Sequence, residues 1–439
     1  MNEIKPFYTY FSLFALIMAV VFLPFSVKIC HLALFLLILS WILQAHWKEK
    51  WNSIISSPII ITFIIFFLLH FIGLFYTEDK ANGWFAIEKK AFWIIIPIVL
   101  ASMPRLEKKY LDLVFLFFIS ACFLGTVICL FNATSLLASN SGADPLSSSL
   151  FKLLNPDSPK QWMYFSYIDL SSGIGLHPTY FSMYLIFCLM LLFRLFHKNF
   201  FSLSKTFKII LIALSFYFGF FIICLSSRVT TLAFLFFVFI GVCVLFQKVS
   251  SVRKLVYSFL AIFFLILLIY FNPVSRYRNY QEVAHISYPQ SHGKPYALSA
   301  DIHASLWWVG LKSTMDINLL WGVGTGGVED LMKNAGIRYG ITNILKTNDP
   351  HNQFLYTTLS LGLIGLFSFL SCLIWPIYLA YQRQDFFYVA FVCLFVFVSL
   401  TETVLEAQKG IVFFSLFNSI LMFQCADWSI FYKRKFSYG

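Results

Sequence analysis

The chain has 439 residues, of which 59% are hydrophobic and only 12% are charged. Because a soluble domain carries about 25% charged residues, this composition excludes an ordinary soluble protein and predicts one embedded in lipid. The net charge of +12 does not indicate a nucleic-acid partner, because many of the lysines and arginines stand in short clusters between apolar runs.

A run that crosses a bilayer as a helix needs about 20 apolar residues, and by that criterion the chain holds about twelve candidates. They lie at roughly 7–25, 27–45, 55–76, 87–103, 111–131, 179–196, 208–226, 229–247, 255–272, 353–381, 386–403 and 410–425. We therefore expect an all-α polytopic membrane protein, with residues 1–439 forming a single transmembrane domain.

The basic clusters predict the orientation of these runs. They are Lys48 and Lys50; Arg105, Lys108 and Lys109; Arg194, Lys198, Lys205 and Lys208; Lys248, Arg253 and Lys254; and Lys433, Arg434 and Lys435. Alternating the runs from a cytoplasmic N-terminus places every cluster on the cytoplasmic side, as the positive-inside rule requires. Two long polar intervals, 132–178 and 273–352, then face outward as loops.

Two candidate residues precede the last of these loops. Arg228 follows Ser226-Ser227 in a very short outer connection, where an arginine is costly unless it is paired or functional. Its planar guanidinium suits a phosphate or pyrophosphate, although it could instead reach the outer interface by snorkelling. His177 opens the 179–196 run and is more typical of a hydrogen-bonded cap than of a catalyst, so we expect it to support the site.

The long outer loop carries further candidates. Arg276 and Arg278 leave the ninth run and either hold the same anionic group or anchor at lipid headgroups. Residues 304–315 have helix-compatible spacing. A glycine-rich run, Gly322–Gly327, lacks the Lys-Ser/Thr ending of a phosphate-binding loop and predicts a tight turn.

His351 stands in Asp349-Pro350-His351-Asn352, at the mouth of the 353–381 run. Aspartate and asparagine suit helix starts, so the segment has a purely structural reading as a helix cap. Histidine also titrates near neutrality, which favours a general base at a membrane–water boundary. Both readings stay open on the residues alone. Glu402 and Glu406 stand four apart on one helical face at an outer boundary. They either pair with an arginine, contact an acceptor molecule, or form a solvated helix end.

Metal and cofactor sites are not predicted. The nine cysteines lie in or beside apolar runs and show no metal-type CxxC spacing. The loop histidines, His285, His292 and His303, lack the i, i+4 pairing of many zinc sites. We expect neither a metal ion nor a cofactor.

Several of these motifs occur together in one known family. The motifs are Ser226-Ser227-Arg228; Trp307 followed by Leu320-Trp321-Gly322-Val323-Gly324; Pro350-His351-Asn352-Gln353 with Gly362 and Gly365; and Glu402 with Gly410. In this order and spacing the chain resembles the O-antigen ligase and polymerase superfamily of bacterial glycosyltransferases. The similarity extends across nearly the whole chain.

The resemblance implies a GT-C-like fold with a large periplasmic loop, in the bacterial inner membrane, and an active site facing the periplasm. It also implies metal-independent, inverting transfer of a glycan from undecaprenyl pyrophosphate, with membrane lipids as surroundings. His351 would activate the acceptor hydroxyl and Arg228 would bind the donor pyrophosphate, with Arg276 and Arg278 as weaker candidates for the same role.

The remaining motif residues would support the site or contact the acceptor. They are His177, His303, Trp307, Asn352 and Glu402. Family members often carry an arginine shortly before the loop tryptophan, whereas here His303 stands four residues before Trp307. That departure puts one donor contact in doubt.

Three activities remain within the resemblance. A ligase would pass the glycan to lipid A-core oligosaccharide, and this is the activity we favour. A polymerase would pass it to another lipid-linked repeat, and a protein O-oligosaccharyltransferase would pass it to a protein. The alternative from another class is a membrane transporter or flippase. Transporters often show repeated halves with broken midplane helices, and this sequence shows no such symmetry.

Overall fold

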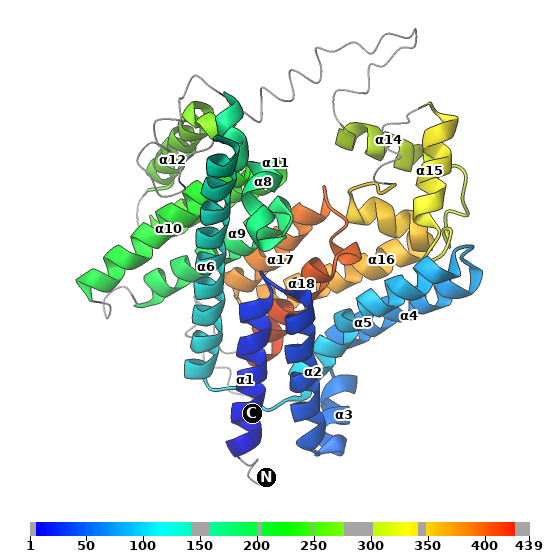
Figure 1. Cartoon of the computed structure of the whole chain (residues 1–439). Helices are drawn as coiled ribbons and strands as arrows, with labels where there is room; N and C mark the ends of the chain where they lie inside the picture. The colour runs from blue at the N-terminus through cyan, green and yellow to red at the C-terminus, as the bar shows by residue number, and fades with distance from the viewer. Residues whose placement is uncertain are drawn as a thin grey trace. The chain divides into compact units, whose positions relative to one another are not determined.

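The computed structural model describes residues 6–141, 159–199, 204–246, 250–275, 302–340 and 348–425. These residues form helices, turns and bends, and no β-strand occurs among them (Figure 1). The prediction of an all-α protein is therefore confirmed. Arg276 and Arg278 lie outside the described residues.

The chain divides into two compact units. The first unit comprises Met1–Ala19, Val27–Val114 and Pro295–Gly439. Its helices are most of α1 (Pro6–Phe22), α2 (Val27–Leu43), α3 (Trp47–Ile55), α4 (Pro58–Tyr76), α5 (Lys80–Ser102), α14 (Ile302–Ser313), α15 (Val328–Arg338), α16 (Gln353–Gln382), α17 (Phe386–Ser399) and α18 (Gln408–Ser419). A 3-10 turn, η4 (Val404–Glu406), precedes α18, and a π-helical turn, η5 (Ile420–Gln424), follows it.

The second unit comprises Val20–Ser26 and Phe115–Lys294. It holds most of α6 (Lys108–Ser141), η1 (Pro159–Phe165), α8 (Tyr167–Ser171), η2 (Ser172–Ile174), α9 (Pro178–Asn199), α10 (Lys205–Leu225), α11 (Arg228–Leu245) and α12 (Ser251–Phe271). Within it α10 and α11 both pack against α9, and α12 packs against α11.

Seven helices of the described residues are long and apolar enough to cross a membrane, by length and composition. They are α4, α6, α9, α10, α11, α12 and α16. The pair α2–α3, bent by 116°, makes an eighth if it is one span. The protein is thus a multi-pass membrane protein. The other runs among the predicted twelve are helical but shorter or more charged: α17 has 14 residues, and α5 carries Glu88, Lys89 and Lys90.

Helix α16 is interrupted at Gly362, whose backbone has φ 64° and ψ −163°. The interruption is filled by the segment 319–324, which contains the start of the glycine-rich run. The amides of Val323 and Gly324 donate to the carbonyls of Leu359 and Ser360, at 2.9 and 2.8 Å. In return, the amides of Leu363 and Ile364 donate to Leu319 and Leu320, at 2.8 and 3.4 Å.

This is an exchange of partners. In an unbroken helix Leu363 and Ile364 would donate to Leu359 and Ser360, four residues back. The inserted segment supplies both the missing donors and the missing acceptors, so the break leaves none of these groups unsatisfied. Non-helical backbone at membrane depth is tolerated only when protein satisfies it in this way. The predicted turn is present, with positive φ at Gly322 and Gly324.

The inserted segment also contacts α4. The Thr325 hydroxyl donates to the His70 carbonyl at 2.5 Å, and the Gly326 amide donates to the Thr77 hydroxyl at 3.1 Å. The Tyr76 hydroxyl donates to the Trp321 carbonyl at 2.6 Å. Since α4 packs against both α5 and α16, these bonds hold three helices of the first unit around one turn.

Candidate active site

The segment 348–352 presents His351 at the start of α16, in the first unit. Asn352 is the helix N-cap, and its side-chain oxygen accepts from the Leu355 amide at 3.0 Å. Asp349 accepts from the His351 amide at 2.7 Å, and Trp307 donates its indole N–H to the His351 carbonyl at 3.3 Å. The backbone of His351 is left-handed, with φ 44°. The capping role thus falls to Asn352, and the His351 ring takes no part in it.

Helices α14 and α15 pack against the first turns of α16 and bring the loop residues to His351 (Figure 1). Their shared apolar core consists of Leu306, Val309, Val328, Met332, Ala335, Leu355, Tyr356 and Leu359. With α14 fixed in this way, the His303 ring lies edge-on to the His351 ring, with centroids 5.3 Å apart. Residues 304–315, predicted to be helical, are largely covered by α14.

The His351 ring is paired with Glu402. Its Nδ1 atom lies 3.5 Å from Oε2 of Glu402, and the two side chains are 26% and 11% exposed. Burial by itself lowers the pKa of the imidazole, but the polar contact with Glu402 and the charges of Asp349 and Glu402 outweigh it. The pKa of His351 is therefore raised above its ordinary value.

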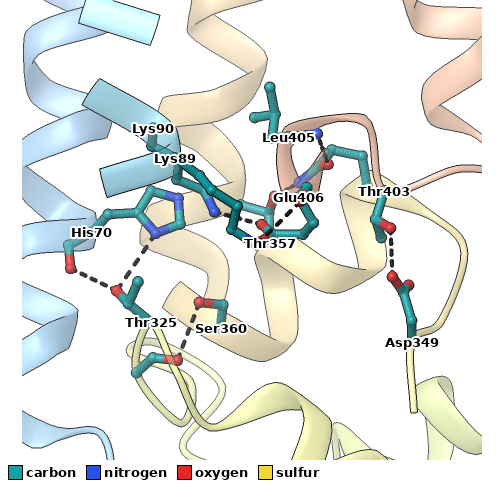
Figure 2. A network of polar contacts seen from close by, with 12 residues as sticks. His70, Lys89, Lys90, Thr325, Asp349, Thr357, Ser360, Thr403, Leu405 and Glu406 are labelled. Atoms are coloured by element: carbon teal, nitrogen blue, oxygen red, sulfur yellow. Dashed lines mark hydrogen bonds and ion pairs between the residues drawn. The ribbon is translucent and has the colours of Figure 1, made fainter. Parts of the chain in front are cut away.

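Asp349 joins this site to the connection between α17 and α18. Its second carboxylate oxygen accepts from the Thr403 hydroxyl at 2.6 Å (Figure 2). Burial raises the pKa of Asp349, although the nearby His351 and the hydrogen bond from Thr403 oppose the rise. One carboxylate thus fixes the backbone that presents His351 and also holds the residue next to Glu402.

A second charged cluster lies a few residues further along, around Glu406 (Figure 2). Lys90 of α5 places its Nζ 2.5 Å from Oε1 of Glu406, and Lys89 lies 3.4 Å from Oε2. Lys89 also donates to the Glu406 carbonyl at 3.1 Å. The Lys90 side chain is only 2% exposed. A lysine buried to this degree requires a charged partner, because removing an ammonium group from water is costly.

The sequence analysis missed this lysine cluster. Lys89 and Lys90 stand near the start of the fourth apolar run, 87–103. Two adjacent cations inside a candidate span are rare and tend to mark pairing or function, so they were the available signal. Glu406 was noted, but without its partners.

The second unit holds Arg228 and His177. Arg228 is the first residue of α11, is exposed, and follows Ser226, whose φ is 49°. The Ser227 hydroxyl lies 3.2 Å from that of Thr179, which links the starts of α11 and α9. The His177 ring packs against Tyr167 and Tyr180, at 5.8 and 6.3 Å between centroids. The supporting role expected for His177 stays a prediction.

Of the predicted site residues, five meet in the first unit: His351, His303, Trp307, Asn352 and Glu402. Across the described parts of the chain, no group of three or more histidine, cysteine, aspartate or glutamate side chains is placed to hold a metal ion. The groups that are placed to act are an imidazole with a carboxylate partner and, beside them, a buried ion pair.

These features define an all-helical multi-pass membrane protein whose polar site pairs a histidine with a carboxylate. Residues 210–370 match the family model described as O-antigen ligase, so this segment carries the domain of that family and the resemblance seen in the sequence is confirmed over these residues. Members of this family are lipid-linked glycan transferases. The matched segment includes Arg228 and His351 but not Glu402 or the lysine cluster. No curated protein matches the chain.

Proposed function

We propose that this protein is an O-antigen ligase-like glycosyltransferase that moves a glycan from undecaprenyl pyrophosphate to lipid A-core oligosaccharide. The observation that supports this most is the pairing of His351 with Glu402 in a family of lipid-linked glycan transferases. A carboxylate on Nδ1 orients the ring and leaves Nε2 to accept a proton, as in other histidine–carboxylate pairs.

In the proposed reaction an acceptor hydroxyl attacks the anomeric carbon of the donor glycan. The new C–O bond forms as the bond to pyrophosphate breaks, and the bonding electrons leave with the pyrophosphate. Nε2 of His351 takes the hydroxyl proton, and Glu402 stabilises the imidazolium that results. Attack from the face opposite the leaving group inverts the anomeric centre. Pyrophosphate is already a good leaving group, so this route uses neither a nucleotide nor a metal ion.

The proposal places the active site on the periplasmic side of the bacterial inner membrane. It keeps the topology of about twelve spans, with 132–178 and 273–352 as periplasmic loops of one transmembrane domain. The basic clusters and the outer boundary expected for His351 and Glu402 support this orientation. Polymerase and protein O-oligosaccharyltransferase are the alternatives within the family.

The direct test is to incubate the purified protein with undecaprenyl-pyrophosphate glycan and lipid A-core oligosaccharide, and to identify products by mass spectrometry. A glycosylated lipid A-core supports the ligase. A lengthened lipid-linked glycan would identify a polymerase, and a glycosylated protein acceptor would identify the third activity. Loss of product in EDTA would contradict metal independence. Movement of intact donor across vesicles without any transfer would favour a flippase.

Arg228→Ala is expected to raise the KM for the lipid-linked donor about tenfold or more, because hydrogen bonds to a charged group contribute roughly 1.5–3 kcal/mol. Arg228→Lys keeps the charge but loses the bidentate fork, so its KM should lie between that of the native protein and that of Arg228→Ala. Arg253→Ala is the matched control, because Arg253 is an exposed arginine of the same unit that bonds to Ser250. A native KM in Arg228→Ala would remove this residue from the donor site.

A further inference from the structure

The connection between α17 and α18 carries Glu402 and has little regular structure of its own. Apart from the 3-10 turn at Val404–Glu406, residues 400–407 are not helical. A carboxylate on such a segment is held in place only by the contacts that the segment makes with its surroundings. The position of Glu402 against His351 therefore depends on those contacts.

Contacts from two directions hold the connection in place. Thr403 donates to Asp349 at 2.6 Å, and the Leu405 amide donates to the side-chain oxygen of Gln353 at 2.8 Å. Both of these partners lie beside His351, at the start of α16. The third contact is the ion pair of Glu406 with Lys90, which reaches α5 instead. Together with the contacts of Lys89, it ties the connection to a different helix.

We propose that Lys90, through its buried ion pair with Glu406, is a positioning residue that holds Glu402 against His351. This inference rests on the proposed function only for its effect on transfer, because the geometry of the pair is independent of the substrate. Lys90 touches neither the reacting atoms nor His351. It acts by fixing the end of the Glu402–Glu406 segment to α5.

The energetics favour such a role over a simple contribution to stability. Burying two opposite charges brings little net stability, because the cost of removing them from water offsets much of their attraction. Buried ion pairs can instead specify one arrangement of a segment among several. The second cation, Lys89, contacts both the carboxylate and the carbonyl of Glu406, which further restricts that residue to one orientation.

The pKa of His351 depends on the charged groups around the two ends of the Glu402–Glu406 segment. His351 faces Asp349 and Glu402, with the ring of His303 beside it. Glu406 faces Lys89 and Lys90, with Tyr356 from α16 and Glu329 from α15 also within electrostatic range. Loss of Lys90 changes the pKa of His351 in two opposed ways. Removing a cation raises it, but Lys90 is not among the groups that shift the pKa of His351, so displacement of Glu402, which lowers the pKa, should dominate.

The test measures the titration of His351 directly. The full-length protein in detergent micelles is treated with diethyl pyrocarbonate across a pH series, and modification of the His351 peptide is followed by mass spectrometry. Only the neutral imidazole reacts, so the midpoint reports the pKa without any transfer assay. Glu402→Gln is the reference variant, and it should move the midpoint of His351 modification to lower pH.

Lys90→Met is expected to shift the midpoint in the same direction as Glu402→Gln, and to lower glycan transfer by about tenfold to hundredfold, since small displacements in an active site have effects of that size. Lys90→Arg keeps the charge, so its midpoint should lie close to that of the native protein. Lys312→Met, on α14, is the control, because the Lys312 ammonium lies over the Trp308 ring and forms no part of the Glu406 cluster; it should leave the midpoint unchanged. When Glu402→Gln is already present, adding Lys90→Met should not lower the His351 midpoint any further.

If Lys90→Met fails to fold because Glu406 loses the closer of its two cations, the double variant Lys90→Met/Glu406→Gln removes both charges of the buried pair and keeps the experiment possible. It too should lower the midpoint. An unchanged or raised His351 midpoint in the folded variants would overturn the positioning role. Absence of glycan transfer in the native protein would contradict the proposed function and leave the positioning result intact.

Discussion

His351→Ala is expected to lower the rate of glycan transfer by about 10²–10⁴-fold, which is the usual contribution of a general base. The expectation follows from a partly exposed imidazole whose Nδ1 faces Glu402, an arrangement that assigns the substrate proton to Nε2 in the proposed reaction. Transfer is measured with purified lipid-linked donor and lipid A-core acceptor. The variant should insert and elute from size exclusion like the native protein.

The left-handed backbone at His351 calls for two further variants. Alanine is mildly strained at φ 44°, whereas asparagine tolerates this region, so His351→Asn separates loss of the base from strain. His46→Ala is the matched control, because His46 is also left-handed, with φ 55°, and lies outside the site. Full activity in His351→Asn would refute the assignment of the base.

The raised pKa of His351 also fixes the sign of the pH dependence. A base must be neutral, so transfer should rise with pH through the folded-state pKa, which lies above the ordinary value of 6.5. Glu402→Gln should move this rise to lower pH, because a partner that favours the charged ring is lost. Stability has the opposite dependence. The charged ring contributes fully below the ordinary pKa, and its contribution is lost as the pH rises through the raised one.

Gly362→Ala is expected to lower the free energy of unfolding by at least about 3 kcal/mol, because the backbone there adopts a conformation open almost only to glycine. A Cβ at this position would lie 2.2 Å from the carbonyl carbon and oxygen of Leu320 and 2.5 Å from the amide nitrogen of Trp321. These are backbone atoms and have no rotamer by which to withdraw. The measurement is the midpoint of thermal unfolding in detergent, followed by fluorescence-detected size exclusion.

Gly340→Ala separates the two causes of this loss. Gly340 also has a positive φ, of 70°, but nothing lies within 4 Å of a Cβ built there. Its replacement should therefore cost only the left-handed strain of about 1–2 kcal/mol. Equal unfolding midpoints for the two variants would contradict the steric argument and, with it, the close fit of the inserted segment in α16.

Hydropathy was sufficient to predict an all-helical membrane protein and the order of its helices, because spanning a bilayer imposes length and composition on each segment. It gave no sign of the break at Gly362. An exchange of backbone hydrogen bonds leaves no trace in composition, and Gly362 stands in an apolar run like any other. The predicted run 386–403 was longer than α17, because the helix ends at Ser399 and Thr401, Glu402 and Thr403 belong to the connection that follows it.

Only part of the site could be predicted from the sequence. His351, Trp307 and Glu402 belong to recognisable motifs, and the structure brings them together. The ties that hold Glu402 in place come from Asp349, Gln353 and Lys90. The last of these lies far away in the sequence, on α5. Such a pairing is decided by the packing of helices, which a single sequence does not reveal.

The contacts of the inserted segment also bear on the order in which the first unit assembles. Helix α4 leaves the ribosome long before its partners Trp321, Thr325 and Gly326 are synthesised, and α16 follows only after them. Until then α4 has α5 as a neighbour but not the turn that joins it to α16. Completion of the first unit therefore waits for the last third of the chain, and it depends on contacts between segments distant in sequence, which form slowly. A truncated chain ending before α16 would leave this turn without its main hydrogen-bond partners.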